Sequence, residues 1–295
     1  MSGYYDIKTL CSTLGVNRSS YYYYLKHTEP NRYQKDNKEL DELILKEYHS
    51  SGGKYGSPKI TRVLKKKEVF VSEKRVARRM KVLGLKSIVV KKYNHNGHKK
   101  SKDDGKPRPN LLKQDFKSDK PFRKLVADIT YIWTTDMGWT YLATVEDLFE
   151  RRIVGWHYGI TMDENLTIKA LDNAVISAKG FDLKNAIFHN DRGTQYTSDN
   201  FEARILELGL IHSYSKKAYP YDNAAMESFN SIIKREEINC NPYTTFYETN
   251  MRIFKFIEGW YNNIRIHSSI DYLTPNEVFN NYLKNQISQK TAIAL

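Results

Sequence analysis

The first thirty residues carry two short runs of apolar residues at helical spacing. Within residues 7–25, Gly15 separates these runs and Asn17 is placed to cap the second. Two helices joined by a turn that contains glycine form the helix-turn-helix pattern. The pattern is weak when taken alone, because many helical hairpins share it. It nevertheless predicts a small helical domain at residues 1–30.

The same periodicity is stronger over residues 38–92. A helix is predicted at about 38–49. A second helix is predicted after Ser57, where Ser57 supplies an N-cap and Pro58 a favoured first-turn proline. A third helix is predicted to be capped by Ser72 and to end at Gly84. These residues are predicted to form a second, all-α domain.

Polar residues, lysines, Gly and Pro dominate residues 93–120, which predicts a linker. Beyond it the pattern changes to alternating strand-like runs at 125–133, 139–147 and 151–160, which predict an antiparallel meander. Shorter elements then alternate: helices at 165–178, 198–208 and about 222–238, and strands at 186–189 and 210–214. The pattern predicts a mixed α/β domain at 121–240, and helices at 245–263 and 275–284 in a C-terminal extension, 241–295.

Charge divides the chain in the same place. The net charge is +13, but residues 1–120 hold 29 Lys and Arg against 13 Asp and Glu, whereas residues 121–295 hold 18 against 21. The basic excess in residues 1–120, beside a near-neutral second part, favours DNA binding by the first part. The alternative is a basic surface that is solvated and binds no ligand. The chain has no secretory signal and no apolar run long enough for a bilayer, so we expect a cytoplasmic protein without a membrane partner.

The helix after Ser72 is the best candidate for a DNA contact. Its outer positions are predicted to hold four cations, Arg75, Arg78, Arg79 and Lys81. Such a helix suits a groove or a phosphate backbone. For any one of these residues, a solvated face without a ligand remains the alternative.

Two aspartates stand where catalytic carboxylates could lie. Asp128 is inside the first predicted strand, on the face shared by Val126, Thr130 and Ile132, and a carboxylate in such surroundings is costly unless it is paired or binds a metal. Asp191 ends the fourth predicted strand, the place where ligands gather in α/β sheets. A hydrogen-bonded buried Asp and a turn-forming Asp are the respective alternatives.

A third carboxylate, Glu227, lies on the long helix near residue 222. Glu227 and Lys234 are seven residues apart, on one helical face. Alone, these charges are ordinary for an exposed helix. Carboxylates converging from a strand, a strand end and a helix would suit two Mg²⁺ or Mn²⁺ ions, which can drive an in-line phosphoryl displacement.

Several motifs together resemble a known family. The segments His189 to Ser198 (HNDRGTQYTS) and Asp222 to Phe229 (DNAAMESF), with 35 residues between Asp191 and Glu227, are similar to the Asp-Asp-Glu core of retroviral integrases. Four more segments narrow the resemblance to the second reading-frame product of bacterial insertion sequences of the IS3 family: KYGSPKI from 54, VSEKRVARRM from 71, DITYI from 128, and YNNIRIH from 261 followed by LTP from 273. The resemblance spans about residues 40–282, with one departure, Leu125 where the family commonly has Trp.

The resemblance implies a DNA transposase with an RNase H-like core that cleaves insertion-sequence ends and transfers strands. It implies metal ligation by Asp128, Asp191 and Glu227 and a DNA contact by Lys234. It also implies an upstream reading-frame product as partner or fusion, while the cutting of two ends suggests a homo-oligomer on DNA. Two other functions are weighed: a DNA-binding regulator without catalysis, which has no reason to keep three carboxylates, and a nuclease for RNA–DNA hybrids, which the basic N-terminal helices disfavour.

Overall fold

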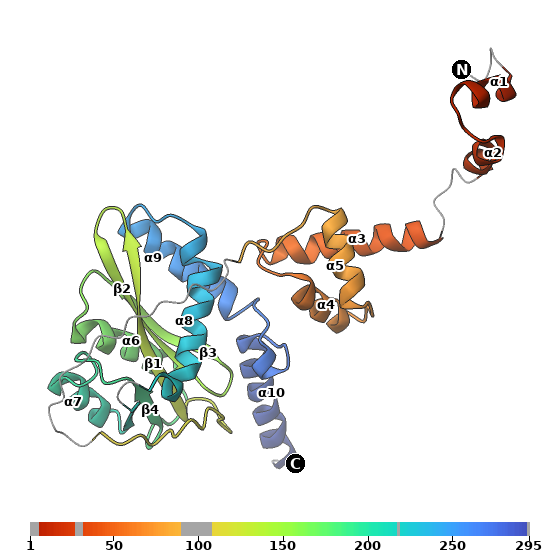
Figure 1. The fold of residues 1–295 in the computed structure, drawn as a ribbon. Coiled ribbons are helices and arrows are strands. Elements are labelled where there is room, and N and C mark those ends of the chain that lie inside the picture. Colours follow the sequence, from red (N-terminus) through yellow and green to blue (C-terminus); the bar gives the residue numbers. More distant parts are fainter. Residues whose placement is uncertain (1–5, 27–31, 90–107, 217–218, 294–295) are drawn as a thin grey trace. The chain divides into compact units, whose positions relative to one another are not determined.

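The protein divides into two compact units, Met1–Ser87 and Ile88–Leu295. The structure, a computed structural model, describes residues 6–26, 32–89, 108–216 and 219–293 (Figure 1). Predictions for residues 1–5, 27–31 and 93–107 therefore lie outside the described residues. Within the described ranges, no helix is both long and apolar enough to cross a bilayer.

The first unit is entirely helical in its described parts, as the periodicity predicts. Its helices are α1 (Ile7–Thr13), α2 (Arg18–Lys26), α3 (Arg32–Ser50), α4 (Ser57–Lys66) and α5 (Glu73–Val82). Asn17 Oδ1 accepts a hydrogen bond from the Ser19 N–H at the start of α2, and the Ser72 side chain accepts one from the Arg75 N–H at the start of α5. The predicted cap by Ser57 is wrong: Ser57 is the first residue of α4, and the N-cap is Gly56, which has no side chain to offer.

Helices α3, α4 and α5 pack on one another around a small apolar core. The core takes one stripe from each helix: Leu40 and Ile44 from α3, Ile60 and Leu64 from α4, Val76 and Met80 from α5. A spacing of four residues puts each pair on one helical face. This burial explains why three short helices form a compact body.

The second unit is built on a five-stranded mixed sheet in the order β3-β2-β1-β4-β5. Its strands are β1 (Lys124–Thr134), β2 (Gly138–Asp147), β3 (Arg152–Gly159), β4 (Ile187–Asn190) and β5 (Ile211–Tyr214). Strands β1, β2 and β3 pair antiparallel, which confirms the predicted meander, while β4 is parallel to both β1 and β5. The mixed α/β fold class is confirmed.

Helices cover both faces of the sheet. One face, which includes Leu125 and Ala127 of β1, packs against α6 (Glu164–Ser177) and α7 (Asp199–Glu207) in the main hydrophobic core. Leu125, at the position where the family commonly has Trp, is fully buried there. Strand alternation turns Val126 and Asp128 to the opposite face, where α8 (Ala224–Glu236) runs after the short 3₁₀ turn Pro220–Asn223 (Figure 1).

The C-terminal part is helical but not continuous. The helix predicted at 245–263 consists of α9 (Phe246–Phe254) and a π-helical stretch, Lys255–Tyr261. Short 3₁₀ turns stand at Ile238–Cys240 and Ser268–Ile270, and α10 (Pro275–Ile293) ends the described chain.

Part of the predicted linker is docked on the second unit. The N–H groups of Leu111 and Leu112 donate to Ser213 Oγ, and Leu112 is buried. Asn110 and Gln114 donate to the two carboxylate oxygens of Asp222. Residues 110–114 therefore form a strap that is tied to β5 and to the turn before α8.

Candidate active site

Asp128 lies in the middle of β1, beneath α8. Its half-buried carboxylate is held from two sides: Oδ1 accepts the Ile129 N–H at 2.8 Å, and Oδ2 accepts Asn230 Nδ2 of α8 at 2.8 Å. The Asn223 side-chain amide donates to the Ala127 carbonyl at 3.1 Å, which joins the start of α8 to the same strand. These bonds fix the position of α8 over Asp128.

Asp191 follows β4 directly, because β4 ends at Asn190. Its Oδ1 accepts the Gly193 N–H at 2.9 Å. Glycine at this position leaves space for the contact, because a Cβ would stand 3.0 Å from Asp191 Oδ1 and 3.1 Å from Gln195 Oε1. The missing side chain lets the backbone close on the carboxylate.

Glu227 and Lys234 both lie on α8. Met226, Phe229 and Ile233 form the buried stripe of this helix, while Glu227 is exposed and Lys234 is half-buried. Glu237, three residues after Lys234, is a nearby acid, but in the described part of the chain no ion pair joins the two and Glu237 pairs with Arg252.

The charges around Asp128 show which side chains the fold brings together. Burial raises the pKa of Asp128 well above its ordinary value, and the negative charge of Asp191 raises it further. The ammonium of Lys234 lowers this pKa, and the charge of Glu227 raises it. Burial also raises the pKa of Asp191, against the lowering effect of the Gly193 N–H. Asp191, Glu227 and Lys234, from two other parts of the sequence, therefore lie within electrostatic reach of Asp128.

The donor set suits a hard divalent cation, because it offers carboxylate oxygens and no sulfur or imidazole ligand. A cation would also offset the mutual repulsion that raises the pKa of Asp128. In the residues that the structure describes, no three His, Cys, Asp or Glu side chains stand close enough together to hold a metal. Ligation by all three carboxylates therefore requires that at least one of their side chains moves.

Sequence reasoning missed several polar side chains around the carboxylates. Asn230, whose amide holds Asp128, lies three residues after Glu227 on the same helical stripe, which was the available signal. Buried side-chain oxygens of Thr130, Tyr196 and Asn230 have no hydrogen-bond partner among the described residues. Tyr196 is only 2% exposed, and after burial the charges of Asp128 and Asp191 raise the pKa of its hydroxyl. The site is thus lined by polar atoms from β1, α8 and the loop after β4.

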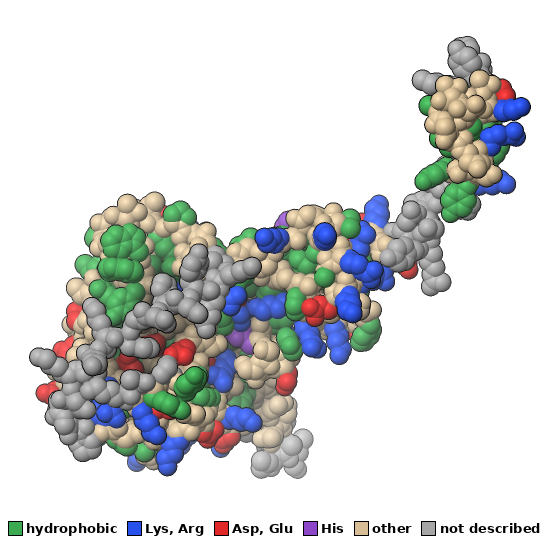
Figure 2. Space-filling view, in the orientation of Figure 1, with side chains coloured by type: hydrophobic (Ala, Val, Ile, Leu, Met, Phe, Trp, Pro, Cys, Tyr) green, Lys and Arg blue, Asp and Glu red, His purple; other side chains and the backbone are tan. Residues whose placement is uncertain are grey.

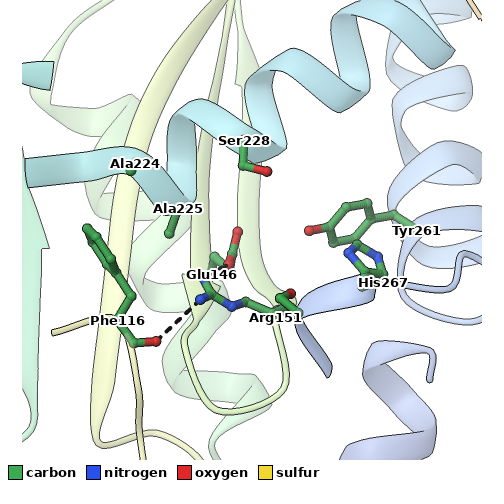
Figure 3. Close-up of a pocket in the computed structure, with 9 residues that line it drawn as sticks. Phe116, Glu146, Arg151, Ala224, Ala225, Ser228, Tyr261 and His267 are labelled. Carbon is green, nitrogen blue, oxygen red and sulfur yellow. Dashed lines mark hydrogen bonds and ion pairs between the residues drawn. The ribbon is translucent and has the colours of Figure 1, made fainter. Parts of the chain in front are cut away.

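A cavity of about 200 Å³ opens on the α8 side of the sheet (Figure 3). Glu146 of β2 lies in its wall, and its Oε1 pairs with Arg151 Nη1 at 3.2 Å, while Arg151 Nη2 donates to the Phe116 carbonyl. Burial raises the pKa of Glu146 to about 7, with Arg151 opposing the rise. Glu146 pairs in register with Val126, two residues before Asp128, so its side chain lies on the same face of the sheet as Asp128.

The cations of α5 belong to the first unit, and they do not all face outward as predicted. Arg78 and Lys81 are exposed. Arg75 and Arg79 turn towards α3, where Arg75 donates to Asn37 Oδ1 and Arg79 donates to both carboxylate oxygens of Asp41. The prediction of four outward cations is therefore wrong for Arg75 and Arg79, because acceptors on α3 draw them inward.

Comparison with solved structures finds retroviral integrases at low similarity. A simian T-cell lymphotropic virus intasome in complex with PP2A regulatory subunit B56 gamma matches with a TM-score of 0.43 and 15% identity, covering 67% of this chain and 63% of that chain. The HTLV-2 integrase catalytic core domain in complex with magnesium (trimeric form) matches with a TM-score of 0.38 and 16% identity, covering 54% and 96%.

Comparison of sequences is far more specific. Residues 35–93 match an HTH-like domain, and residues 118–220 and 208–275 match integrase core domains. The transposase for insertion sequence element IS904 of Lactococcus lactis is 37% identical over 255 residues, 85% of this chain and 97% of the relative. Transposase InsF for insertion sequence IS3A of Escherichia coli is 33% identical over 281 residues, 95% and 96% of the two chains. The chain therefore belongs to the IS3 family of insertion-sequence transposases, as a DNA transposase and polynucleotidyl transferase with an integrase core.

Proposed function

We propose that Asp128, Asp191 and Glu227 are the catalytic carboxylates that cleave insertion-sequence ends and transfer the freed strands. The observation that carries this proposal is the electrostatic convergence on Asp128, whose pKa responds to both other carboxylates although they come from a strand end and a helix. Repelling carboxylates are costly in a fold unless a ligand compensates them.

Two Mg²⁺ or Mn²⁺ ions would be held by the three carboxylates. When bound, such ions supply an activated nucleophilic oxygen and stabilisation of the leaving oxygen in phosphoryl transfer. Asp128 and Asp191 are pre-positioned for ligation by the backbone N–H groups of Ile129 and Gly193. Glu227, exposed on α8, completes the set by a side-chain movement.

The neighbours of the carboxylates have separate roles. Asn230 orients Asp128 by donating its amide N–H to Oδ2, while the Ile129 N–H holds Oδ1. Lys234 is near enough to lower the pKa of Asp128, and it attracts a phosphate of the bound DNA. Because a single phosphate contact depends on charge more than on shape, Lys234 contributes to DNA positioning and not to metal ligation.

We further propose that the basic helices of the first unit recognise the ends of the element. Arg78 and Lys81 are exposed and serve as phosphate or base contacts, while Arg75 and Arg79 stabilise α5 against α3. Residues 1–30 and 38–92 then form the DNA-binding part, 93–120 the connection, 121–240 the catalytic core and 241–295 a helical extension. The protein would act as a homo-oligomer on DNA, with an upstream reading-frame product as partner or fusion.

The test is substitution of each carboxylate by Ala, followed by cleavage and strand-transfer assays in Mg²⁺ on DNA from the flanks of the gene. Each variant is expected to lose both activities while keeping its unfolding temperature and DNA affinity. Glu207→Ala, an exposed glutamate on α7, is the matched control and should remain active. Substantial cleavage by Glu227→Ala would overturn the assignment and favour another acid as ligand.

A further inference from the structure

Asp222, in the turn before α8, has a buried carboxylate that the proposed chemistry does not use. The residue is 2% exposed. Its Oδ2 accepts Asn110 Nδ2 at 2.7 Å and the Lys216 N–H at 2.9 Å, and its Oδ1 accepts Gln114 Nε2 at 3.0 Å. Burial acts to raise the pKa of Asp222, but these donors and the charge of Lys216 together hold it below its ordinary value. The ionised side chain therefore ties the strap, residues 110–114, to the start of α8.

The strap is also fixed to the strands beside Asp191. Ser213 Oγ of β5 accepts the N–H groups of Leu111 at 2.8 Å and Leu112 at 3.2 Å, and Leu112 is buried. The same Oγ is bonded to His189 Nδ1 at 2.8 Å. His189 lies on β4, two residues before Asp191, so the strap has a fixed seat on β4 and β5.

Arg192, the residue directly after Asp191, makes a second connection. Its Nε donates to the Ser215 carbonyl at 3.1 Å, and its Nη2 donates to the Arg108 carbonyl at 3.2 Å. Arg108 stands two residues before the strap. The chain that enters the strap is therefore bonded to the loop that carries Asp191.

The turn that contains Asp222 leads to the other two carboxylates. Asn223, the next residue, donates its side-chain amide to the Ala127 carbonyl at 3.1 Å, beside Asp128. Glu227 lies in the first turn of α8. A displacement of this turn would therefore move the start of α8, and Glu227 with it, relative to the sheet.

A strap that only covered apolar surface would not require a buried acid. Burial of Leu112 and the backbone hydrogen bonds to Ser213 suffice for a cover, whereas a buried ionised carboxylate is costly unless donors compensate it. The bonds also end beside Asp191 and before α8, two elements whose carboxylates must approach a shared cation. Such groups have to be held within roughly 0.5 Å of their productive positions.

We propose that Asp222 is a positioning residue for the transposase reaction: by binding the strap, it fixes the start of α8, and so Glu227, relative to Asp191. In this role Asp222 contacts neither DNA nor metal and acts through the placement of Glu227. The inference rests on the proposed role of the carboxylates, but the docking of the strap can be measured without it.

Gln114→Glu tests the connection from the strap side, because it places a second carboxylate against Asp222 Oδ1. Gln114 is exposed, so the variant should fold. In the full-length, metal-free protein, amide hydrogen exchange at Leu111 and Leu112 should become faster as the strap is released. Mn²⁺ affinity, measured by titration calorimetry, should fall by about 10- to 100-fold, the usual loss when a residue that orients metal ligands is changed. The added negative charge by itself would attract the cation, so a weaker affinity would not be a direct charge effect.

The double variant Gln114→Glu/Asp222→Asn reverses the donor and the acceptor. The new amide can donate to the new carboxylate, while its oxygen still accepts from Asn110 and the Lys216 N–H. Strap exchange and Mn²⁺ affinity should return to near the wild-type values. Gln289→Glu adds the same charge at an exposed glutamine of α10 and, as the matched control, should change neither measurement.

Three results would overturn the positioning role. Unchanged strap exchange in Gln114→Glu would show that docking does not depend on Asp222. Faster exchange with unchanged Mn²⁺ affinity would leave the strap as a cover. A weaker Mn²⁺ affinity that the double variant does not restore would mean that the loss is independent of this bond. The carboxylate assignment fails separately, if Asp191→Ala and Glu227→Ala cleave DNA and bind Mn²⁺ as tightly as the wild type.

Discussion

Single residues show how burial sets the chemistry of the acids in this core. Glu146 is 2% exposed on β2, and its charge is matched only in part by Arg151. A carboxyl that loses hydration without full compensation binds its proton more tightly, so its pKa rises to about 7. Removing Glu146 therefore tests the cost of burying this charge beside the active site.

Glu146→Gln should change how stability depends on pH. The folded pKa of about 7 exceeds the ordinary value of 4.5, so the contribution of this carboxyl to stability is complete below pH 4.5 and is lost as the pH rises through 7. Glutamine does not titrate. Relative to the variant, the wild type should lose roughly 3 kcal/mol of unfolding free energy over this interval, measured by urea unfolding at several pH values.

Glu207→Gln, at an exposed glutamate, controls for the substitution itself and should show no such divergence. Parallel stability curves for the wild type and Glu146→Gln would contradict the raised pKa.

At the scale of elements, the layers of the core depend on close backbone contact between β3 and α6. Gly155 of β3 faces α6, and a Cβ built there would stand 2.2 Å from the Ala170 carbonyl oxygen and 2.5 Å from the Ala174 nitrogen. Both atoms belong to helix backbone, which cannot rotate away as a flexible side chain can. The helix must therefore lift from the sheet to admit even a methyl group.

Gly155→Ala should lower the free energy of unfolding by about 1–3 kcal/mol or more, because overpacking forces the helix and sheet apart. Chemical or thermal unfolding measures the loss. Gly259→Ala is the matched control: Gly259 has open space around its added Cβ, and the substitution should be close to neutral. If the two variants were equally stable, the contact between β3 and α6 would be looser than described.

At the scale of the whole molecule, we expect DNA affinity and catalysis to be carried by different parts of the chain. The first unit, residues 1–87, holds 19 Lys and Arg against 9 Asp and Glu, whereas the three proposed catalytic acids lie in the second unit. Exposed lysines and arginines gather on the helices of the first unit (Figure 2). We expect DNA affinity to depend on the first unit and on salt, since neutralised phosphates release counterions.

Arg78→Ala and Arg79→Ala should have different effects although the residues are neighbours. Arg78 is exposed, so its loss should weaken DNA binding and reduce the slope of log affinity against log salt by about 1, without changing the unfolding temperature. Arg79 is bound to Asp41, so its loss should lower the unfolding temperature. Fluorescence anisotropy across a salt series and thermal unfolding measure the two effects, and an unchanged salt slope for Arg78→Ala would identify a solvated surface.

The sequence alone determined the elements and their chemistry. The hydrophobic repeats of 2 residues in a strand and 3.6 residues in a helix involve only residues that are near one another in the sequence. The β1–β3 meander, the cap at Ser72 and the buried stripe of α8 could therefore be predicted. Motif spacing also identified the three acids as candidates, and family membership through these motifs is confirmed by the sequence comparisons.

Only the tertiary structure decided which partners meet. Arg79 turns inward because packing brings Asp41, 38 residues away, beneath it, and Asn230 reaches Asp128 across 102 residues. The strap at 110–114 is bound by Asp222, although its composition is that of a linker. The physical reason is that hydrogen bonds and burial depend on distances in the folded chain, while local patterns record only which face of an element a residue occupies.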